Sequence, residues 1–460
     1  MKKTKTQDVV IGSGPAGEGA AMQLSKAGRE VTVVERFGRV GGGCTHWNTI
    51  PSKALRFAIF RFTEALQNPL LNSLDVRAKF SFADLRKQTQ DVINQQESLR
   101  RGFYQRNRVQ VVSGQARFEN ANRLMIDAET QIEFENAIIA TGSRPYRPPA
   151  IDFEHSRIFD SDKILLLDEM PRTLTVYGAG VVGCEYASMF RNLGIKVNLI
   201  NSRESLLDFL DDEVSDALSY HMREQGVVIR HNEQFESLQT HQDHVQVKLE
   251  SAKEIKSDIF LWANGRTGNS DQLGLESIGL APDSRGYLKV DKYGQTSLDN
   301  VYAVGDVVGF PSLASAAYTQ GRTAARRLLG HELPDELVSD FPTGIYTSPE
   351  ISSIGKTETE LTELKVPYEI GRAQFKDLAR AQITGRPVGM LKLIFHRETL
   401  ELLGVHCFGP NASEIIHIGH AVMAGNSPEK SIAYFINSTF NYPTMAEAYR
   451  VAALNGLNRL

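Results

Sequence analysis

The fold is decided by residues 8–35, which read DVVIGSGPAGEGAAMQLSKAGREVTVVE. The apolar run Val9–Ile11 is typical of a parallel strand that is buried on both faces. A glycine turn follows, and Pro15–Ala27 predicts a helix with proline in its first turn, where the missing N–H costs nothing. After a helix-ending glycine, Val31–Val34 predicts a second strand that ends at Glu35. The stretch therefore predicts one βαβ unit.

The turn carries the spacing Gly12-x-Gly14-x-x-Gly17, which suits a dinucleotide pyrophosphate. Gly12 permits a tight turn, Gly14 lets phosphate approach the backbone, and Gly17 lets helix and strand pack closely. The N-terminus of the helix offers free N–H groups to the anion. Glu35 can accept hydrogen bonds from ribose hydroxyls. The motif alone could be an ordinary glycine-rich turn, but these flanks favour a dinucleotide site.

A second βαβ unit begins with the strand Leu174–Tyr177 and the turn Gly178-x-Gly180-x-x-Gly183. In both units, the same number of residues separates the first glycine of the turn from the residue that ends the second strand. The second unit ends at Asn201, however, where the first ends at an acid. The repeat predicts a second dinucleotide site with a different ribose environment.

The end of the second unit bears on the choice between NAD(H) and NADP(H). Without a carboxylate at Asn201, a 2′-phosphate is not repelled, and Arg203 could pair with it. The Asn201 amide can still hydrogen-bond a hydroxyl. The second site is therefore predicted to accept both dinucleotides, and the alternative is that Arg203 is a solvated surface arginine.

Composition narrows the class of protein. The chain has 460 residues, which is long enough for roughly three domains. Its net charge of −4 gives no general attraction to nucleic acid or to anionic membranes. Three scattered cysteines fit a reducing compartment rather than a disulfide framework. Glu18 interrupts the first apolar stretch, and no window resembles a membrane span. We expect a soluble, cytoplasmic protein that binds neither nucleic acid nor membrane.

Later segments extend the pattern. Residues 296–306 predict a strand that runs into Asp306, and a helix is expected from Ala314. An acid at the carboxyl end of a strand, beside a helix N-terminus, lies where ligands bind in open α/β sheets. Residues 82–106 predict a polar helix, and from about Asp340 short strands alternate with amphipathic helices. The last region is therefore expected to be a further domain with another role.

Together, these segments resemble the flavoprotein pyridine nucleotide-disulfide oxidoreductases, such as glutathione reductase and dihydrolipoamide dehydrogenase. The matching motifs are GSGPAG, GGGCTHWNTIPSKA, ATGSRP, GAGVVGCEYA, ANGRTGN, YAVGD, TSPEISSIGKTE and YPTMAEA. The resemblance implies an α/β protein with two Rossmann-like domains and a C-terminal α+β dimerisation domain. It places the FAD domain at 1–152 and 276–340, the NAD(P) domain at 153–275 and the dimerisation domain at 341–460, so that the chain forms a homodimer or larger homo-oligomer.

The resemblance also implies the cofactors and further site residues. It puts bound FAD on the first unit and NAD(H) or NADP(H), as substrates, on the second. Asp306 would lie at the flavin ribitol, and Lys53 near flavin N5 with Glu185 as its ion-pair partner; Lys53 could instead be a surface lysine. The remaining candidates for contact with a dinucleotide are Gly42, Gly43, Cys44, Gly142 and Gly265.

Two departures from the family pattern indicate the reaction. The disulfide reductases have Cys-x4-Cys, whereas Thr49 follows Cys44 here at that spacing, and threonine cannot form a disulfide. Their C-terminal His-Pro-Thr-x-x-Glu is replaced by a motif that starts with Tyr442, whose ordinary pKa makes it a poor base at neutral pH. We therefore expect reversible hydride transfer between NADPH and NAD+ by a ping-pong mechanism through flavin N5, with no disulfide relay.

Alternatives stay open for the thiols and for one helix. Cys44 could tune the flavin, could serve a diaphorase or oxidase with quinone, oxygen or persulfide as acceptor, or could simply pack as a small hydrophobe. A flavin-bearing redox sensor with little turnover is a third possibility. Cys184 and Cys407 are expected to be structural. The run Glu414, His417 and His420 lies on one helix face, where a polar interface patch is favoured over metal ligation, so no metal is expected.

Overall fold

The computed structural model describes residues 2–67, 81–334, 341–425 and 429–460, which form two compact units. The first unit comprises residues 1–149, 160–170 and 265–337, and the second comprises 150–159, 171–264 and 338–460. The second unit thus contains both the second βαβ region and the C-terminal region, which the sequence predicts as separate domains. The limits of those three domains remain a prediction.

The first unit is built on a seven-stranded sheet with the order β3-β2-β1-β6-β5-β4, in which β17 also pairs with β6. The strands are β1 (Lys2–Ile11), β2 (Val31–Glu35), β3 (Gln110–Ser113), β4 (Ala116–Asn120), β5 (Arg123–Ile126), β6 (Thr130–Ile139) and β17 (Val301–Ala303). The pairs β1–β2, β1–β6, β2–β3 and β6–β17 are parallel. The pairs β4–β5 and β5–β6 are antiparallel, so the predicted βαβ unit lies in the parallel part of a mixed sheet.

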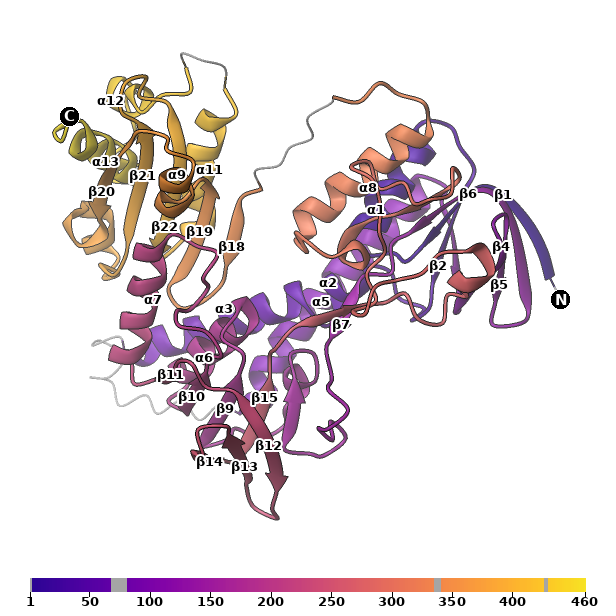
Figure 1. Cartoon of the computed structure of the whole chain (residues 1–460), viewed down its shortest axis with the longest axis horizontal. Coiled ribbons are helices and arrows are strands. Elements are labelled where there is room, and N and C mark those ends of the chain that lie inside the picture. The colour runs from indigo at the N-terminus through magenta and orange to yellow at the C-terminus, as the bar shows by residue number, and fades with distance from the viewer. Residues whose placement is uncertain (1, 68–80, 335–340, 426–428) are drawn as a thin grey trace. The chain divides into compact units, whose positions relative to one another are not determined.

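Helices complete the first unit: α1 (Pro15–Lys26), α2 (Gly42–His46), α3 (Thr49–Gln67), α5 (Phe82–Arg106) and α8 (Ala314–Leu328). Helices α1 and α8 run side by side (Figure 1) because both carry glycine at their contact. A Cβ on Gly321 would overlap the carbonyl of Ala16. Helix α5 matches its predicted range and begins with a capping box, in which Ser81 accepts from the Asp84 N–H and Asp84 accepts from the Ser81 N–H.

The strand predicted over residues 296–306 is wrong in length, because β17 covers only Val301–Ala303. The preceding residues form a turn. The Thr296 hydroxyl donates to the Val301 carbonyl at 2.7 Å and accepts from the Leu298 N–H at 3.1 Å. Side-chain hydrogen bonds of this kind compete with strand pairing. The position of Asp306 just after the strand is as predicted, at the start of the 3₁₀ turn Gly305–Val308.

The second unit contains a five-stranded sheet with the order β11-β10-β9-β15-β8. Its strands are β8 (Ile158–Asp160), β9 (Thr173–Tyr177), β10 (Lys196–Ile200), β11 (Val228–Arg230) and β15 (Ile259–Trp262), and the helices beside it are α6 (Val181–Asn192) and α7 (Asp212–Glu224). A small antiparallel sheet follows: β12 (Phe235–Thr240), β13 (Val245–Leu249) and β14 (Glu254–Ser257). The second predicted βαβ unit is β9-α6-β10.

The C-terminal region forms an antiparallel sheet with the order β18-β19-β22-β21-β20. Its strands are β18 (Thr343–Ile345), β19 (Glu350–Gly355), β20 (Tyr368–Gln374), β21 (Met390–His396) and β22 (Leu402–Gly409). Its helices are α9 (Glu358–Glu363), α10 (Ala379–Ile383), α11 (Ala412–Met423), α12 (Ala433–Asn437) and α13 (Glu447–Leu457). This confirms the predicted change to short strands and helices. None of the described helices of the chain is long and apolar enough to cross a membrane.

A buried lysine ties the two parts of the second unit together. Lys392 of β21 is 1% exposed, and its ammonium donates to Asp211 at 2.7 Å and pairs with Glu213 at 3.1 Å and with Glu358. Burial raises the pKa of Asp211, but the neighbouring His406 and the Lys392 ammonium outweigh it, so the pKa lies below its ordinary value. Lys392 is thus the cation that compensates the buried Asp211 carboxylate.

We predict that Lys392→Met lowers the thermal stability of the protein. The substitution leaves the buried Asp211 carboxylate without its cation, which costs about 3–5 kcal/mol, whereas Glu213 keeps its pairing with Arg372. The melting temperature at pH 7 should fall by several degrees. Because the pKa of Asp211 is depressed, its stabilising contribution is present above about pH 4 and is lost as the pH falls below that value. The difference between the variant and the parent should therefore shrink in acid.

The matched control is Lys248→Met, which removes an exposed lysine that pairs with Glu236 at 2.6 Å on β13. Exposed pairs contribute little to stability. This variant should melt with the parent protein. A Lys392→Met variant that did the same at pH 7 would contradict the role assigned to the buried cluster.

Candidate dinucleotide sites

The first glycine turn has the close contacts that its spacing predicts. Gly12 has a φ of +106°, and a Cβ there would overlap the carbonyl of Ala140. A Cβ on Gly17 would overlap the carbonyl of Gly12, so helix α1 packs directly on the turn. Gly14 differs from both, since the nearest atom to its Cβ would be Gly42 Cα at 3.9 Å. Gly14 therefore leaves open space above the N-terminus of α1.

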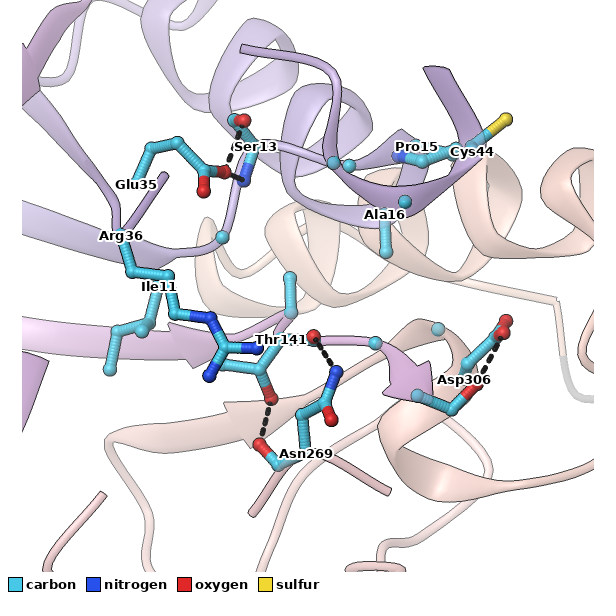
Figure 2. A pocket seen from close by; sticks show the side chains of 18 of the residues that line it. Ile11, Ser13, Pro15, Ala16, Glu35, Arg36, Cys44, Thr141, Asn269 and Asp306 are labelled. Atoms are coloured by element: carbon cyan, nitrogen blue, oxygen red, sulfur yellow. Dashed lines mark hydrogen bonds between the residues drawn. The ribbon is translucent and has the colours of Figure 1, made fainter. Parts of the chain in front are cut away.

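That space is part of a cavity of about 370 Å³ in the first unit (Figure 2). This volume is within the usual range of ligand pockets. The predicted site residues that line it are Gly12, Gly14, Glu35, Gly42, Gly43, Cys44, Gly142 and Asp306. Segments that are far apart in the sequence thus meet around one cavity. Gly17 lies behind the turn, and Gly265 bonds the backbone of Tyr146 elsewhere in the first unit.

Glu35 is held firmly at the end of β2. One of its carboxylate oxygens accepts from the Ser13 N–H at 3.1 Å and from the Ser13 hydroxyl at 2.5 Å, as Figure 2 shows. The other oxygen accepts from the Phe37 N–H at 3.0 Å. These bonds fix the strand-end acid beside the glycine turn. The remaining acceptor capacity of the carboxylate can receive a further hydrogen bond.

Asp306 is oriented by a short chain of hydrogen bonds. Its carboxylate accepts from the Ser143 hydroxyl at 2.9 Å, and the Ser143 hydroxyl accepts from Arg266 at 2.8 Å. Residues that sequence reasoning missed also line the cavity, among them Asp162 and Asn269. Burial raises the pKa of Asp162 to about 6. Asn269 ends the motif ANGRTGN, but the motif alone assigned it no role, and Asp162 belongs to none of the motifs. Only the folded chain brings both residues to the glycine turn.

Cys44 lies at the cavity with the Thr49 hydroxyl as its partner. Burial raises the pKa of the Cys44 thiol, and the hydrogen bond with Thr49 opposes this effect only in part. The protein has three free cysteines, of which Cys184 and Cys407 are fully buried in the second unit. Burial raises the pKa of both thiols. Cys44 thus carries a thiol of raised pKa that is not joined to another cysteine.

The second glycine turn repeats the geometry of the first. Gly178 has a φ of +103°, and a Cβ there would lie 2.8 Å from the carbonyl group of Ala263. A Cβ on Gly183 would overlap the carbonyl of Gly178, as Gly17 does with Gly12. A Cβ on Gly180 would meet nothing within 4 Å. The second turn therefore also offers open space at a helix N-terminus.

Glu185 lies on α6 and is 6% exposed. Its carboxylate accepts from the Tyr346 N–H at 2.8 Å. Farther along the same face of α6, the Ser188 hydroxyl accepts from the Ser348 N–H at 3.1 Å, and the Asn192 amide donates to the Ser348 hydroxyl at 2.8 Å. Segment 346–348 thus holds α6 along one face. Lys53 lies on α3 of the other unit, so its pairing with Glu185 remains a prediction.

Among the described residues, one cluster of three acidic side chains is close enough to share a metal ion. Its members are Asp211, Glu213 and Glu358. The ammonium of Lys392 already pairs with all three. The residues Glu414, His417 and His420 lie on α11 but do not form such a group in the described part of the chain.

Comparison with known proteins places the chain in a family. The family model described as pyridine nucleotide-disulphide oxidoreductase matches residues 6–321, and the model of that family's dimerisation domain matches residues 341–453. The chain belongs to the pyridine nucleotide-disulphide oxidoreductases. The resemblance stated from its motifs is thus confirmed, as is the α/β fold with a C-terminal dimerisation domain.

Three relatives with similar sequences share a name. Proteins from Photorhabdus laumondii, Serratia proteamaculans and Yersinia pestis are each 59% identical to this chain over 98% of both sequences. Each is named soluble pyridine nucleotide transhydrogenase. Each alignment therefore covers nearly all of both sequences.

Solved structures of the family share the fold. The HOCl-induced flavoprotein disulfide reductase RclA from Escherichia coli aligns with a TM-score of 0.88 and 27% identity, over 97% of this chain and 99% of that one. LpdA from Mycobacterium tuberculosis aligns with a TM-score of 0.88 and 25% identity, over 97% of this chain and 99% of that one. Unlike a disulfide reductase with Cys-x4-Cys, this family member has Thr49 beside Cys44.

We predict that Gly14→Val and Gly180→Val weaken the binding of different nucleotides. Both glycines have an ordinary negative φ, so the backbone tolerates valine. Valine at either site fills the space above a helix N-terminus, and overpacking by about 1–3 kcal/mol weakens binding about 5- to 150-fold. Gly14→Val should purify with little FAD, whereas Gly180→Val should keep FAD and lose affinity for NAD(P)H.

The FAD content follows from the absorbance ratio of flavin to protein, and nucleotide affinity follows from calorimetric titration. Circular dichroism of both variants should match the parent. Loss of FAD from Gly180→Val with retention in Gly14→Val would reverse the assignment of the two turns.

Proposed function

We propose that this protein catalyses reversible hydride transfer between NADPH and NAD+ with bound FAD. The observation that carries the proposal is the pairing of two equivalent glycine turns with a single thiol at the first of them. The relatives named soluble pyridine nucleotide transhydrogenase agree with it. Bound FAD supplies a carrier that accepts hydride from one nicotinamide and returns it to another.

The first turn suits FAD in shape and chemistry. Gly14 leaves room for a pyrophosphate at the N-terminus of α1, where N–H groups and the helix dipole attract anions. Glu35 would accept from the ribose hydroxyls of the adenosine half, and Asp306 would bind the ribitol side. Gly42 and Gly43 line the same cavity and let the chain pass close to the ligand.

The second turn would bind one nicotinamide dinucleotide at a time. Gly178, Gly180 and Gly183 give it the same open helix N-terminus as the first turn. Asn201 and Arg203 stand at the end of β10, where an acid would exclude NADP(H). One pocket would thus serve both substrates, which a ping-pong reaction requires.

Lys53 and Glu185 would act at the nicotinamide. A Lys53 ammonium near the reacting rings would stabilise negative charge there, and Glu185 would balance and orient it. The Tyr346 N–H donates to the Glu185 carboxylate and fixes its position. Lys53 and Glu185 would thus position the flavin and nicotinamide rings and would not themselves carry electrons.

The thiol relay of disulfide reductases has no place in this proposal. Thr49 leaves Cys44 without a partner thiol, and Tyr442 replaces the histidine that would act on thiols. With a raised pKa, Cys44 is a weak nucleophile. The dimerisation domain of the family supports a homo-oligomer. We further propose that the protein works in the cytoplasm and does not bind nucleic acid, since its net charge of −4 offers no attraction to it.

A stepwise anaerobic experiment tests the reaction. NADPH should bleach the flavin absorbance, and after removal of nucleotide NAD+ should restore it promptly with one NADH formed per flavin. A flavin that stays reduced with NAD+ and reoxidises only with quinone, oxygen or a persulfide would overturn the proposal and favour a diaphorase or oxidase.

We predict that Cys44→Ser retains transhydrogenation to within about twofold, because electrons do not pass through the thiol. Steady-state rates with NADPH and NAD+ would be compared at equal FAD content. Lys53→Met serves as the contrasting variant and should lower kcat by at least about tenfold, since it removes the cation at the reacting rings. Loss of activity in Cys44→Ser would make the thiol part of the reaction.

A further inference from the structure

The segment between β10 and α7 begins with an asparagine that is turned toward its own loop. Asn201 is 4% exposed, and its amide nitrogen donates to the Ser205 carbonyl at 2.7 Å. The same nitrogen lies 3.1 Å from His231 Nδ1, and the amide oxygen accepts from the Arg203 N–H at 3.2 Å. Asn201 therefore builds the loop, and the discrimination between dinucleotides falls to other residues of this segment.

Arg203 is the cation of the segment, and it is already paired. Its Nη1 donates to both carboxylate oxygens of Asp208, five residues later. The Arg203 side chain is 67% exposed and that of Asp208 is 41% exposed. Water therefore reaches both partners, and exposed ion pairs of this kind are weak and readily opened. In the described part of the chain Arg203 uses one nitrogen of its guanidinium, which carries five N–H donors in a fixed fork.

The two substrates of the proposed reaction differ at one group. NADP(H) carries a phosphate on the ribose, with a charge of roughly −2, where NAD(H) has a hydroxyl. A fixed, unpaired arginine would favour the phosphate, and a fixed carboxylate would favour the hydroxyl. A pocket that must accept both needs a charge that can be present or neutralised as required.

We propose that Asp208 is the exchangeable counter-ion of Arg203. With NAD(H), Asp208 keeps the guanidinium neutralised beside the uncharged ribose. With NADP(H), the guanidinium leaves Asp208 and binds the 2′-phosphate, a charge-assisted and potentially bidentate contact that is stronger than the exposed pair. Asp208 thereby lowers the affinity for NADP(H) and brings it closer to that for NAD(H). This inference rests on the proposed use of the second turn by both dinucleotides.

The test is a double-mutant cycle with Asp208→Asn and Arg203→Gln, measured by calorimetric titration of NADP+ and NAD+ into the FAD-loaded protein at fixed ionic strength. Asp208→Asn should tighten NADP+ binding by about three- to fivefold and leave NAD+ binding within about twofold. Arg203→Gln should weaken NADP+ binding by about tenfold or more and spare NAD+.

The cycle separates exchange from simple charge repulsion. If Asp208 acts through Arg203, the gain from Asp208→Asn disappears in the Arg203→Gln background. A gain that persists there would overturn the proposal and leave Asp208 as a repelling charge only. Unchanged NADP+ affinity in Asp208→Asn would overturn it as well.

Glu204→Gln is the matched control, because Glu204 is exposed in the same segment and carries the same charge. It should change the affinity for either nucleotide by less than about twofold. Parent protein that binds only one of the two dinucleotides would contradict the proposed function itself. Parent protein that binds both, with no coupling in the cycle, would contradict the counter-ion exchange alone.

Discussion

In both glycine turns, a helix rests directly on the carbonyl of the glycine that opens the turn. Gly17 contacts Gly12 in this way, and Gly183 contacts Gly178. No side chain fits between them, so the helix axis must point at the space above the turn. The close packing of helix on turn follows from this contact, and the open space at the middle glycine lies at the N-terminus of the same helix. Around it, each unit places its ligand-facing residues.

The features that the sequence predicted correctly are those that depend on neighbouring residues. Glycine spacing and apolar runs predicted both βαβ units and the helix over residues 82–106, because these features are local. The gathering of Glu35, Cys44 and Asp306 around one cavity followed from the family motifs. The resemblance also predicted the family correctly. The contacts of these residues with cofactors and the domain limits remain predictions.

What the sequence did not predict depends on contacts between distant segments. Lys392 lies in the apolar run MLKLIFH, where nothing local indicates its three acidic partners. Two of them lie at the start of α7 and the third begins α9. Asp162 and Asn269 reach the cavity only through the tertiary fold. The shortened β17 reflects a side-chain hydrogen bond from Thr296, which competes with strand pairing in a way that apolar patterning does not register.

The discontinuity of the first unit has a consequence for biosynthesis. Residues 137–139 of β6 are fully buried, and β17, made from residues 301–303, covers one edge of that strand. A ribosome produces the N-terminal part first, and the second βαβ region emerges before β17 does. Throughout that interval the nascent chain carries an unpaired apolar strand edge, the kind of surface that chaperones shield and that mispairs between chains. Strand β17, made late in synthesis, thus completes a sheet whose first strand is β1 at the N-terminus.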